Sequence, residues 1–268
     1  MAKTPAKKSE QKSPLRILVT NDDGIHAPGL AALVRIAKKL SSDVWVVAPE
    51  EEHSGAGHSL SLAAPVRLRK IGPKKYAVKG TPTDCVLMAI RHVMTERKPD
   101  LVLSGINRGQ NIADDVTYSG TIAAAMEGTQ LGVPSVALSQ AFGFSESRKV
   151  KWATAEHYAP AILKKLVKAG WPQDVLININ FPDVSVDAVK GVQVTAQGKR
   201  DQSLVRVEER IDAREKPYYW FGFDRIVSNP PEGTDIRAIY DGYISVSPLH
   251  MNLTHSRTRA ALVTALGK

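Results

Sequence analysis

Short apolar runs alternate with helically spaced segments over the first two thirds of the chain. Five apolar runs are typical of strands that are buried on both faces of a parallel sheet. They cover residues 16–20, 44–49, 101–104, 136–139 and 175–179. Four segments between them place apolar residues every three or four positions, as helices do. These segments are 28–40, 83–96, a stretch beginning near 119, and 149–169. Strand alternating with helix predicts a doubly wound, mostly parallel α/β sheet with right-handed crossovers.

The pattern is interrupted once within this region and changes after it. Two β-prone stretches at 66–69 and 76–78 predict a hairpin joined through Gly72 and Pro73. After about residue 180 the chain alternates apolar and polar residues, as antiparallel strands do. The clearest such stretches are 191–196, 205–211 and 244–246. We therefore expect a doubly wound α/β core over residues 15–182 and a β-rich extension over 183–268. The Pro-, Ser- and Lys-rich residues 1–14 predict a disordered basic tail.

Composition supports a folded protein outside a membrane. The chain has 268 residues, of which 43% are hydrophobic and 24% charged, so it can bury a large core. No apolar run approaches the roughly 18 residues that a membrane span requires. The single cysteine, Cys85, cannot form an internal disulfide, which fits a reducing compartment. No apolar run follows the N-terminal lysines, so we expect no secretory signal, no membrane partner and a cytoplasmic location.

The chain carries a net charge of +9. Residues 1–14 contribute +3 of this, from four lysines and one glutamate, which leaves +6 for the remainder. Positive charge of this size attracts phosphates, but it does not distinguish a polynucleotide from a small phosphorylated molecule.

Polar sequences follow several of the predicted strands. Ligands of open parallel sheets bind beyond the carboxyl ends of the strands. Four such ends are polar here: 21–24, 50–61, 104–111 and 139–140. We expect these segments to meet at one rim of the sheet and to form the functional site.

Asp22 and Asp23 are adjacent, and Gly24 permits a tight turn that aims both into one site. Two neighbouring carboxylates repel unless a cation or a proton intervenes. An ordinary Asp-Gly turn is the alternative interpretation. No Cys or His cluster has zinc-binding spacing, so a metal here would take oxygen ligands, which suit Mg²⁺, Mn²⁺ or Ca²⁺. Ser54 and Asn107 lie on loops that can complete such a shell.

Residues 118–121 open a helix of small residues. A helix N-terminus offers free backbone N–H groups and a favourable dipole to a phosphate. A simple N-cap role for Ser119 is the alternative. Arg108 is a candidate for neutralising the charge of a phosphate. The alternative interpretation is an ordinary surface arginine.

Other candidates are weaker. His53 and His58 flank a small-residue loop and can donate protons or hydrogen bonds, or simply face solvent. Thr83 and Asp84 are typical of a helix start, and Cys85 is better explained as a small packed residue than as a nucleophile. The chain contains no P-loop, no G-x-G-x-x-G after its first strand and no G-x-S-x-G elbow, which disfavours kinase-like, dinucleotide-binding and serine-hydrolase functions.

Several of these segments together resemble the SurE family, the survival-protein nucleotidases. The similar segments arrive in family order and extend over nearly the whole chain after the tail. They are Ile17 to Ile25, Ala27 to Leu30, Ala48-Pro49 with Ser54-Gly55, Gly57 to Ser59, Gly80 to Pro82 with Asp84 to Val86, Ser104 to Gly109 with Asn111, Tyr118 to Thr121 with Ala124-Ala125 and Glu127-Gly128, and Val246 to Leu249.

The resemblance implies a metal-dependent phosphomonoesterase that hydrolyses nucleoside 5′-monophosphates to nucleoside and phosphate. Some family members also cleave 3′-monophosphates or short polyphosphate. It implies one divalent cation per subunit, Mg²⁺ or Mn²⁺. The implied metal ligands are Asp22, Asp23, Ser54 and Asn107, and the two aspartates are also the implied catalytic residues. The phosphate is expected to contact Asn21, Asn107, Arg108, Ser119, Gly120 and Thr121.

The family fold is a Rossmann-like, three-layer αβα domain whose C-terminal extension exchanges between subunits, so the resemblance implies a homodimer or homotetramer. Residues 251–255 depart from the family pattern in the spacing of His255, for which we expect no catalytic role.

Two other functions are weighed against this one. A non-catalytic nucleotide- or RNA-binding regulator predicts salt-sensitive binding to polynucleotide and no phosphate release. A haloacid-dehalogenase-like phosphatase requires D-x-D after its first strand, whereas the aspartates here are adjacent. We expect a nucleotide as the small-molecule partner and no stable nucleic-acid partner.

Overall fold

The computed structural model describes residues 13–143, 149–200, 205–223 and 229–267. The predicted disordered tail, residues 1–14, lies almost entirely outside these ranges. Within them, nine strands form one sheet in the order β3-β4-β2-β1-β5-β6-β7-β11-β8, and β9 and β10 form a second sheet. The strands are β1 (Arg16–Thr20), β2 (Asp43–Pro49), β3 (Arg67–Gly72), β4 (Lys75–Lys79), β5 (Leu101–Arg108), β6 (Ser135–Gln140), β7 (Val175–Phe181), β8 (Val192–Val194), β9 (Val205–Ile211), β10 (Pro217–Phe223) and β11 (Ile244–His250).

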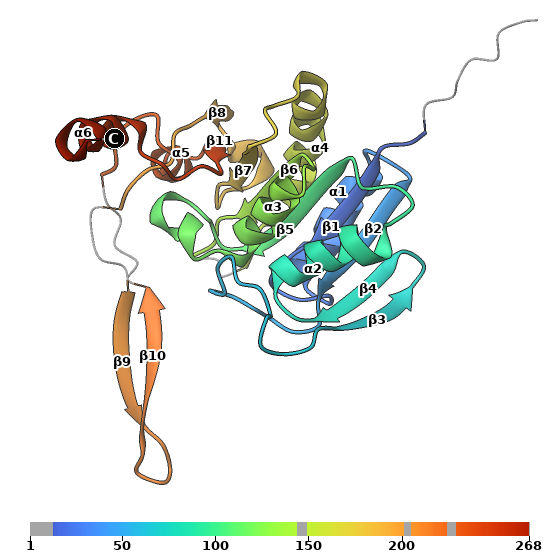
Figure 1. Cartoon of the computed structure of the whole chain (residues 1–268), viewed down its shortest axis with the longest axis horizontal. Helices are drawn as coiled ribbons and strands as arrows, with labels where there is room; N and C mark the ends of the chain where they lie inside the picture. Colours follow the sequence, from blue (N-terminus) through green and yellow to red (C-terminus); the bar gives the residue numbers. More distant parts are fainter. Residues whose placement is uncertain (1–12, 144–148, 201–204, 224–228, 268) are drawn as a thin grey trace, which may run out of the picture.

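Helices cover both faces of the main sheet (Figure 1). The α-helices are α1 (Pro28–Lys38), α2 (Pro82–Met88), α3 (Gly120–Gln130), α4 (Trp152–Ala169), α5 (Asp235–Tyr240) and α6 (Ser256–Leu266), and three shorter helical turns are η1 (Ala89–Val93), η2 (Ala113–Thr117) and η3 (Val186–Ala188). Ile17 and Val19 of β1 belong to a core with residues of α1 and α4, whereas Leu18 packs with residues of α2 and α3. Because successive side chains of a strand point to opposite faces, the apolar run is buried on both sides. The predicted three-layer αβα architecture is confirmed.

The order of the strands reverses between β1 and β5. β2 lies on one side of β1 and β5 on the other, and both pair with β1 in parallel. β4, β6 and β7 continue the parallel sheet outward, while β3 and β11 are antiparallel to β4 and β7. In a doubly wound sheet such a reversal opens a crevice at the carboxyl ends of the two central strands. The loops after β1 and β5 therefore define the place where a ligand is expected.

The helices that border this crevice begin where the sequence provides caps. α1 begins with Pro28, which suits the first helical turn. Thr81 and Asp84 form a capping box at the start of α2, so the cap lies two residues before the predicted Thr83. α2 ends at Met88 and continues as the π-helical turn η1 to Val93, so the helix predicted over 83–96 is confirmed up to Val93 but changes its geometry after Met88.

β5 extends four residues beyond its predicted end at Ser104 and includes part of the predicted loop at 105–116. Gly105 has a φ of 130°, and a Cβ there would lie 2.2 Å from the carbonyl oxygen of Leu138. The β5–β6 register shifts between Ser104 and Asn107, after which Asn107 pairs with Ser139. Glycine and asparagine have low strand propensity, so pairing with β6 and not local preference extends this strand.

The predicted C-terminal extension contributes to both sheets. β11 pairs with β7, and β8 pairs with β11, so these strands widen the main sheet. The β9–β10 hairpin stands away from it (Figure 1). The strand predicted at 205–211 is confirmed, and that at 191–196 is shorter than predicted. Helices α5 and α6 were not predicted. No helix in the described part of the chain combines the length and apolarity needed to cross a bilayer.

Asp43, at the start of β2, is expected to stabilise the fold in a pH-dependent way. Burial opposes its ionisation, but hydrogen bonds from Lys74 and Arg16, each 2.7 Å long, and from Trp45 outweigh burial and lower its pKa to about 2. Its stabilising effect is therefore complete above the unfolded-state pKa of about 3.9 and is lost as the pH falls through about 2.

Asp43→Asn should lower the free energy of unfolding by about 2 kcal/mol at pH 7. The difference from the wild type should shrink progressively between pH 4 and pH 2, as measured by urea denaturation at several pH values. An equal difference at every pH would mean that the charge of Asp43 contributes nothing.

Candidate active site

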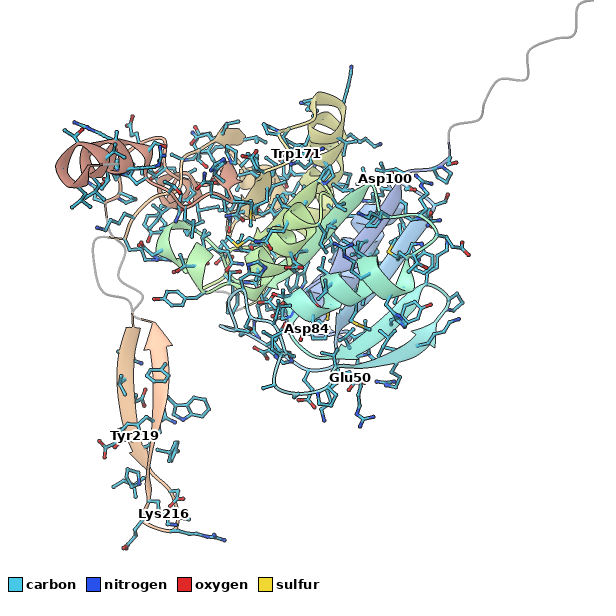
Figure 2. All side chains as sticks on the ribbon, in the orientation of Figure 1. Glu50, Asp84, Asp100, Trp171, Lys216 and Tyr219 are labelled. Carbon is cyan, nitrogen blue, oxygen red and sulfur yellow. The ribbon has the colours of Figure 1, made fainter. Side chains whose placement is uncertain are left out.

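Asp22 and Asp23 follow β1 directly and lie at the strand-order reversal. Asp22 is buried, with 4% of its surface exposed, and Asp23 is partly buried. The Thr121 hydroxyl donates a 2.5 Å hydrogen bond to Asp22 Oδ1. Thr121 lies in the first turn of α3, so the sheet's central strand and the start of α3 meet at this carboxylate. Figure 2 shows Glu50 and Asp84 near the same end of the sheet, and Asp100 and Trp171 near the opposite end.

The two aspartates are electrostatically strained in the absence of a counter-charge. Burial raises the pKa of Asp22, and its hydrogen bond from Thr121 lowers that pKa only in part. Burial and the negative charge of Asp22 raise the pKa of Asp23 to about 6. Glu52 adds negative charge to both. A site that gathers buried carboxylates in this way favours a bound cation, because a cation removes the repulsion.

Ser54 lies on the loop that returns from β2 to the aspartates. The backbone N–H of His53 donates to the carbonyl oxygen of Asp22 over 2.8 Å, which holds the loop against the end of β1. The Ser54 side chain is exposed, and its hydroxyl donates to Glu52 Oε1 over 2.8 Å. The structure therefore brings the Ser54 loop to the aspartates and engages its hydroxyl with Glu52.

Asn107 and Arg108 approach from the other side of β1, at the end of β5. The backbone N–H of Arg108 lies 3.4 Å from Asp23 Oδ2. The Arg108 guanidinium lies 4.8 Å from the ring centre of Phe142, and its charge lowers the pKa of Asp23. The side-chain NH₂ of Asn107 donates to the carbonyl of Gly109. The side-chain oxygen of Asn107 is not used in this bond and can coordinate a cation.

The N-terminus of α3 forms the remaining wall. Ser119 caps the helix by accepting a hydrogen bond from the backbone N–H of Ile122. A Cβ on Gly120 would lie 2.8 Å from Cβ of Asp22, so only glycine allows this close approach. An eleven-residue helix that begins here presents its positive dipole end to the site.

Asn21 occupies a different position from the other predicted residues. It is fully buried, and its amide donates to the carbonyl of Gly24 and closes the turn that carries the aspartates. Its Oδ1 has no hydrogen-bond partner among the described residues. The structure thus gives Asn21 a visible role in shaping the turn.

The predicted donor set fits a hard divalent cation chemically. Asp22, Asp23, Ser54 and Asn107 offer carboxylate, hydroxyl and amide oxygens, the ligand types that Mg²⁺ and Mn²⁺ prefer. No group of three or more His, Cys, Asp or Glu side chains in the described ranges forms a metal-binding cluster. A cation bound by the two carboxylates would therefore complete its coordination with neutral oxygen ligands. The loops after β2 and β5 bring residues with such oxygens to the site.

Two residues that the sequence interpretation missed, Asn178 and Asn180, support this site from behind. The side chains of Asn178 and Asn180 in β7 both donate to the carbonyl of Asn111. Asn180 Oδ1 also accepts a hydrogen bond from the backbone N–H of Asn111. The side chain of Asn111 donates to Ser139. All four residues are buried, so they fix the loop after β5. The sequence did contain a signal for them: asparagine stands at two alternate positions, 178 and 180, of the otherwise apolar strand β7.

Two minor candidates have structural roles. Cys85 is fully buried and burial raises the pKa of its thiol well above the usual value, so it packs in the core as expected. His255 is exposed and caps α6 by accepting a hydrogen bond from the backbone of Thr258.

Comparisons with known proteins identify the family of this chain. The family model "Survival protein SurE" matches residues 17–204. A protein of Parvibaculum lavamentivorans named 5′-nucleotidase SurE is 74% identical over 97% of this chain and 94% of its own length. Another of that name, from Caulobacter sp. strain K31, is 56% identical over 94% of both chains. The crystal structure of SurE protein from Aquifex aeolicus superposes with a TM-score of 0.80 at 41% identity, over 93% of this chain and 99% of that one. The chain belongs to the SurE family.

Proposed function

We propose that this chain is a 5′-nucleotidase that hydrolyses nucleoside 5′-monophosphates to nucleoside and phosphate. The observation that carries the proposal is the juxtaposition of Asp22 and Asp23 with the N-terminus of α3 at the strand-order reversal. Paired carboxylates suit a cation, and a helix N-terminus suits a phosphate, so both halves of a metal-assisted phosphate site meet here. The names of its relatives support the same activity.

We further propose that one divalent cation, Mg²⁺ or Mn²⁺, binds each subunit through Asp22, Asp23, Ser54 and Asn107. The raised pKa values of the two aspartates support this assignment, because they reflect a charge that the protein alone does not balance. The cation would supply charge stabilisation at a phosphoryl oxygen.

The chain's own residues orient the phosphate in this proposal. Backbone N–H groups at the start of α3 face the site and hold phosphoryl oxygens. Thr121 fixes Asp22 while Gly120 leaves room beside it. Our proposed phosphate contacts are Asn21, Asn107, Arg108, Ser119, Gly120 and Thr121.

Asp22 and Asp23 are the proposed catalytic residues, and two routes are open to them. In the first, one carboxylate attacks phosphorus, the bond to the nucleoside 5′-oxygen breaks, that oxygen takes up a proton, and water then hydrolyses the acyl phosphate to release phosphate. In the second, one carboxylate accepts a proton from a water that attacks phosphorus directly, while the nucleoside 5′-oxygen leaves and takes up a proton. Rapid quenching with labelled substrate distinguishes the routes, because only direct attack leaves phosphate on an aspartate.

Chelation is expected to remove most of the activity. Treatment with EDTA should lower phosphate release from 5′-monophosphates at least about tenfold, and added Mg²⁺ or Mn²⁺ should restore it. The measurement is phosphate release from a panel of 5′- and 3′-mononucleotides and short polyphosphate, which also tests whether the last two classes are substrates.

Release that is indifferent to chelation would contradict the cation assignment. Salt-sensitive binding to polynucleotide without release from any substrate would instead favour a non-catalytic nucleotide- or RNA-binding regulator. The first result would contradict only the bound cation, whereas the second would contradict the enzymatic activity.

We also propose a homodimer or homotetramer that works in the cytoplasm. The β9–β10 hairpin exposes a run of aromatic residues, of which Tyr219 is labelled in Figure 2, and Trp220 and Phe221 are 58% and 75% exposed. α6 has no buried residue and exposes Leu262 and Leu266. Apolar surface of this kind is typical of an interface. The free, buried Cys85 suits a reducing compartment. Light scattering of the purified protein distinguishes the two assemblies.

A further inference from the structure

The loop that carries Ser54 is attached to the protein at several points. It runs from the end of β2 to Ser61 with no strand or α-helix of its own. Gly55 and Gly57 adopt positive φ values of 77° and 56°, which bend it back over the start of α3. The Gly57 N–H donates to the carbonyl of Tyr118, immediately before the cap of α3.

One side chain of the loop contacts α3 directly. His58 Nε2 lies 3.1 Å from Glu127 Oε2. Glu127 is buried, with 6% of its surface exposed, and it is the one acidic residue of α3. A buried carboxylate is costly unless it is hydrogen-bonded. The contact with His58 supplies such a hydrogen bond, so each residue holds the other in place.

The same helix also holds the catalytic aspartate. Thr121, in the first turn of α3, donates to Asp22, and Glu127 lies six residues further along the helix. A helix rises about 1.5 Å per residue, so the two contacts are separated by a rigid span of about 9 Å. α3 thus fixes Asp22 at one point and the Ser54 loop at another.

We propose that Glu127 and His58 are positioning residues that hold the 53–61 loop on α3 and so set the place of Ser54 relative to Asp22 and Asp23. The consequence for cation binding rests on the proposed function, whereas the attachment of the loop does not. Neither residue contacts the reacting atoms in this proposal, and each acts through the loop. The other side-chain contacts of the loop, from Thr81 to the carbonyl of Ser59 and from the Ser61 N–H to Asp84, lie beyond His58. On the Ser54 side, the backbone N–H groups of His53 and Gly57 donate to the carbonyls of Asp22 and Tyr118, and every variant below keeps these two contacts.

The test uses the full chain with four single variants and one double variant. Glu127→Ala and His58→Ala remove the contact, and Glu127→Gln keeps an oxygen that accepts a hydrogen bond from His58. His250→Gln is the matched control. His250 also pairs with a carboxylate, that of Asp174 over 2.7 Å, but this exposed pair lies at the amino end of β7, whereas the candidate site lies at the carboxyl ends of the strands. Three quantities are measured for each variant. The first is amide hydrogen exchange of residues 53–61 in the full chain without added cation. The second is Mn²⁺ affinity by calorimetry, and the third is kcat and KM with a 5′-mononucleotide.

Glu127→Ala and His58→Ala should each speed exchange in the loop about tenfold, as expected for the loss of one hydrogen bond. Mn²⁺ affinity should fall about tenfold or more, as when a residue that orients a metal ligand is removed. The loss in activity should appear in kcat more than in KM, because the start of α3 still binds the phosphate. Glu127→Gln should retain most of the wild-type behaviour, and His250→Gln all of it.

The double variant Glu127→Ala with His58→Ala should be no worse than either single variant, because the two residues serve one contact. Additive losses, wild-type exchange in the single variants, or an equal loss in Glu127→Gln would overturn the proposal. If Glu127→Ala fails to fold, His58→Ala alone decides, since its side chain is 27% exposed. If the wild type hydrolyses no nucleotide, the proposed function fails while the exchange data still test the attachment.

Discussion

Asp22→Asn is expected to lower kcat/KM for a 5′-mononucleotide by at least about 100-fold, the usual loss when a group that stabilises transition-state charge is removed. The substitution preserves shape and keeps an oxygen that accepts the hydrogen bond from Thr121. It removes the negative charge that the proposed cation requires. Calorimetry should show a matching loss of Mn²⁺ affinity, so that activity and binding fall together.

The stability of this variant should move in the opposite direction. Because burial raises the pKa of Asp22, the folded state disfavours its charged form, and this cost is greatest at neutral and higher pH. A neutral asparagine avoids that cost and also lowers the repulsion on Asp23. The free energy of unfolding at pH 7 should therefore be unchanged or higher, as is common where function requires a strained site.

Asp174→Asn is the control for this experiment, because its carboxylate is 61% exposed and pairs with His250 away from the site. It should leave both activity and cation affinity at the wild-type level. Full activity in Asp22→Asn would contradict the catalytic role of Asp22. Loss of activity together with a marked loss of stability would mean that the carboxylate serves the fold instead.

Gly29→Ala is expected to lower the free energy of unfolding by about 3 kcal/mol or more, the upper range for an overpacked core. Gly29 lies in the first turn of α1, where alanine is intrinsically preferred by about 1 kcal/mol. The tertiary contact outweighs this preference, because a Cβ at Gly29 would lie 2.0 Å from the carbonyl oxygen of Ile106. The group that it meets there is backbone, so this clash is relieved by separating α1 from β5, and the ring of Trp152 lies 3.1 Å from the same Cβ position.

Chemical denaturation measures this loss, and phosphate release should fall with it, because Ile106 immediately precedes Asn107 in β5. Gly72→Ala is the matched control: nothing lies within 4 Å of a Cβ at that position, and its φ is not in the left-handed region. The control should change stability by well under 1 kcal/mol, within the usual range of surface substitutions. Equal effects of the two substitutions would show that the helix and the strand end are not held together this closely.

Local sequence predicted the elements whose residues carry their own preference. The apolar run of β1 and the residues 205–211 of β9 gave strands with the predicted bounds. Ser119 gave the predicted start of α3 because its side chain satisfies a backbone N–H of the first turn. The positions of Asp22 and Asn107 at one edge followed from the rule that ligands bind beyond the carboxyl ends of parallel strands.

Long-range contacts decided what local sequence did not. Pairing with β6 extended β5 through Gly105 to Arg108, against the propensities of its residues. No local pattern assigned a role to Glu52 or Glu127. The fold places the charge of Glu52 beside both aspartates and buries Glu127 against His58. Their roles depend on partners that are distant along the chain.

By itself, the sequence of this protein determined an α/β sheet, the strand ends that carry polar residues, and a family resemblance with a specific set of site residues. The tertiary structure alone decided how these are held: which strand β5 pairs with, that β11 and β8 widen the main sheet, and that α3 fixes both Asp22 and the Ser54 loop. The physical reason is that periodicity and capping act over a few residues, whereas burial of charge and close backbone approach depend on neighbours that only the folded chain brings together.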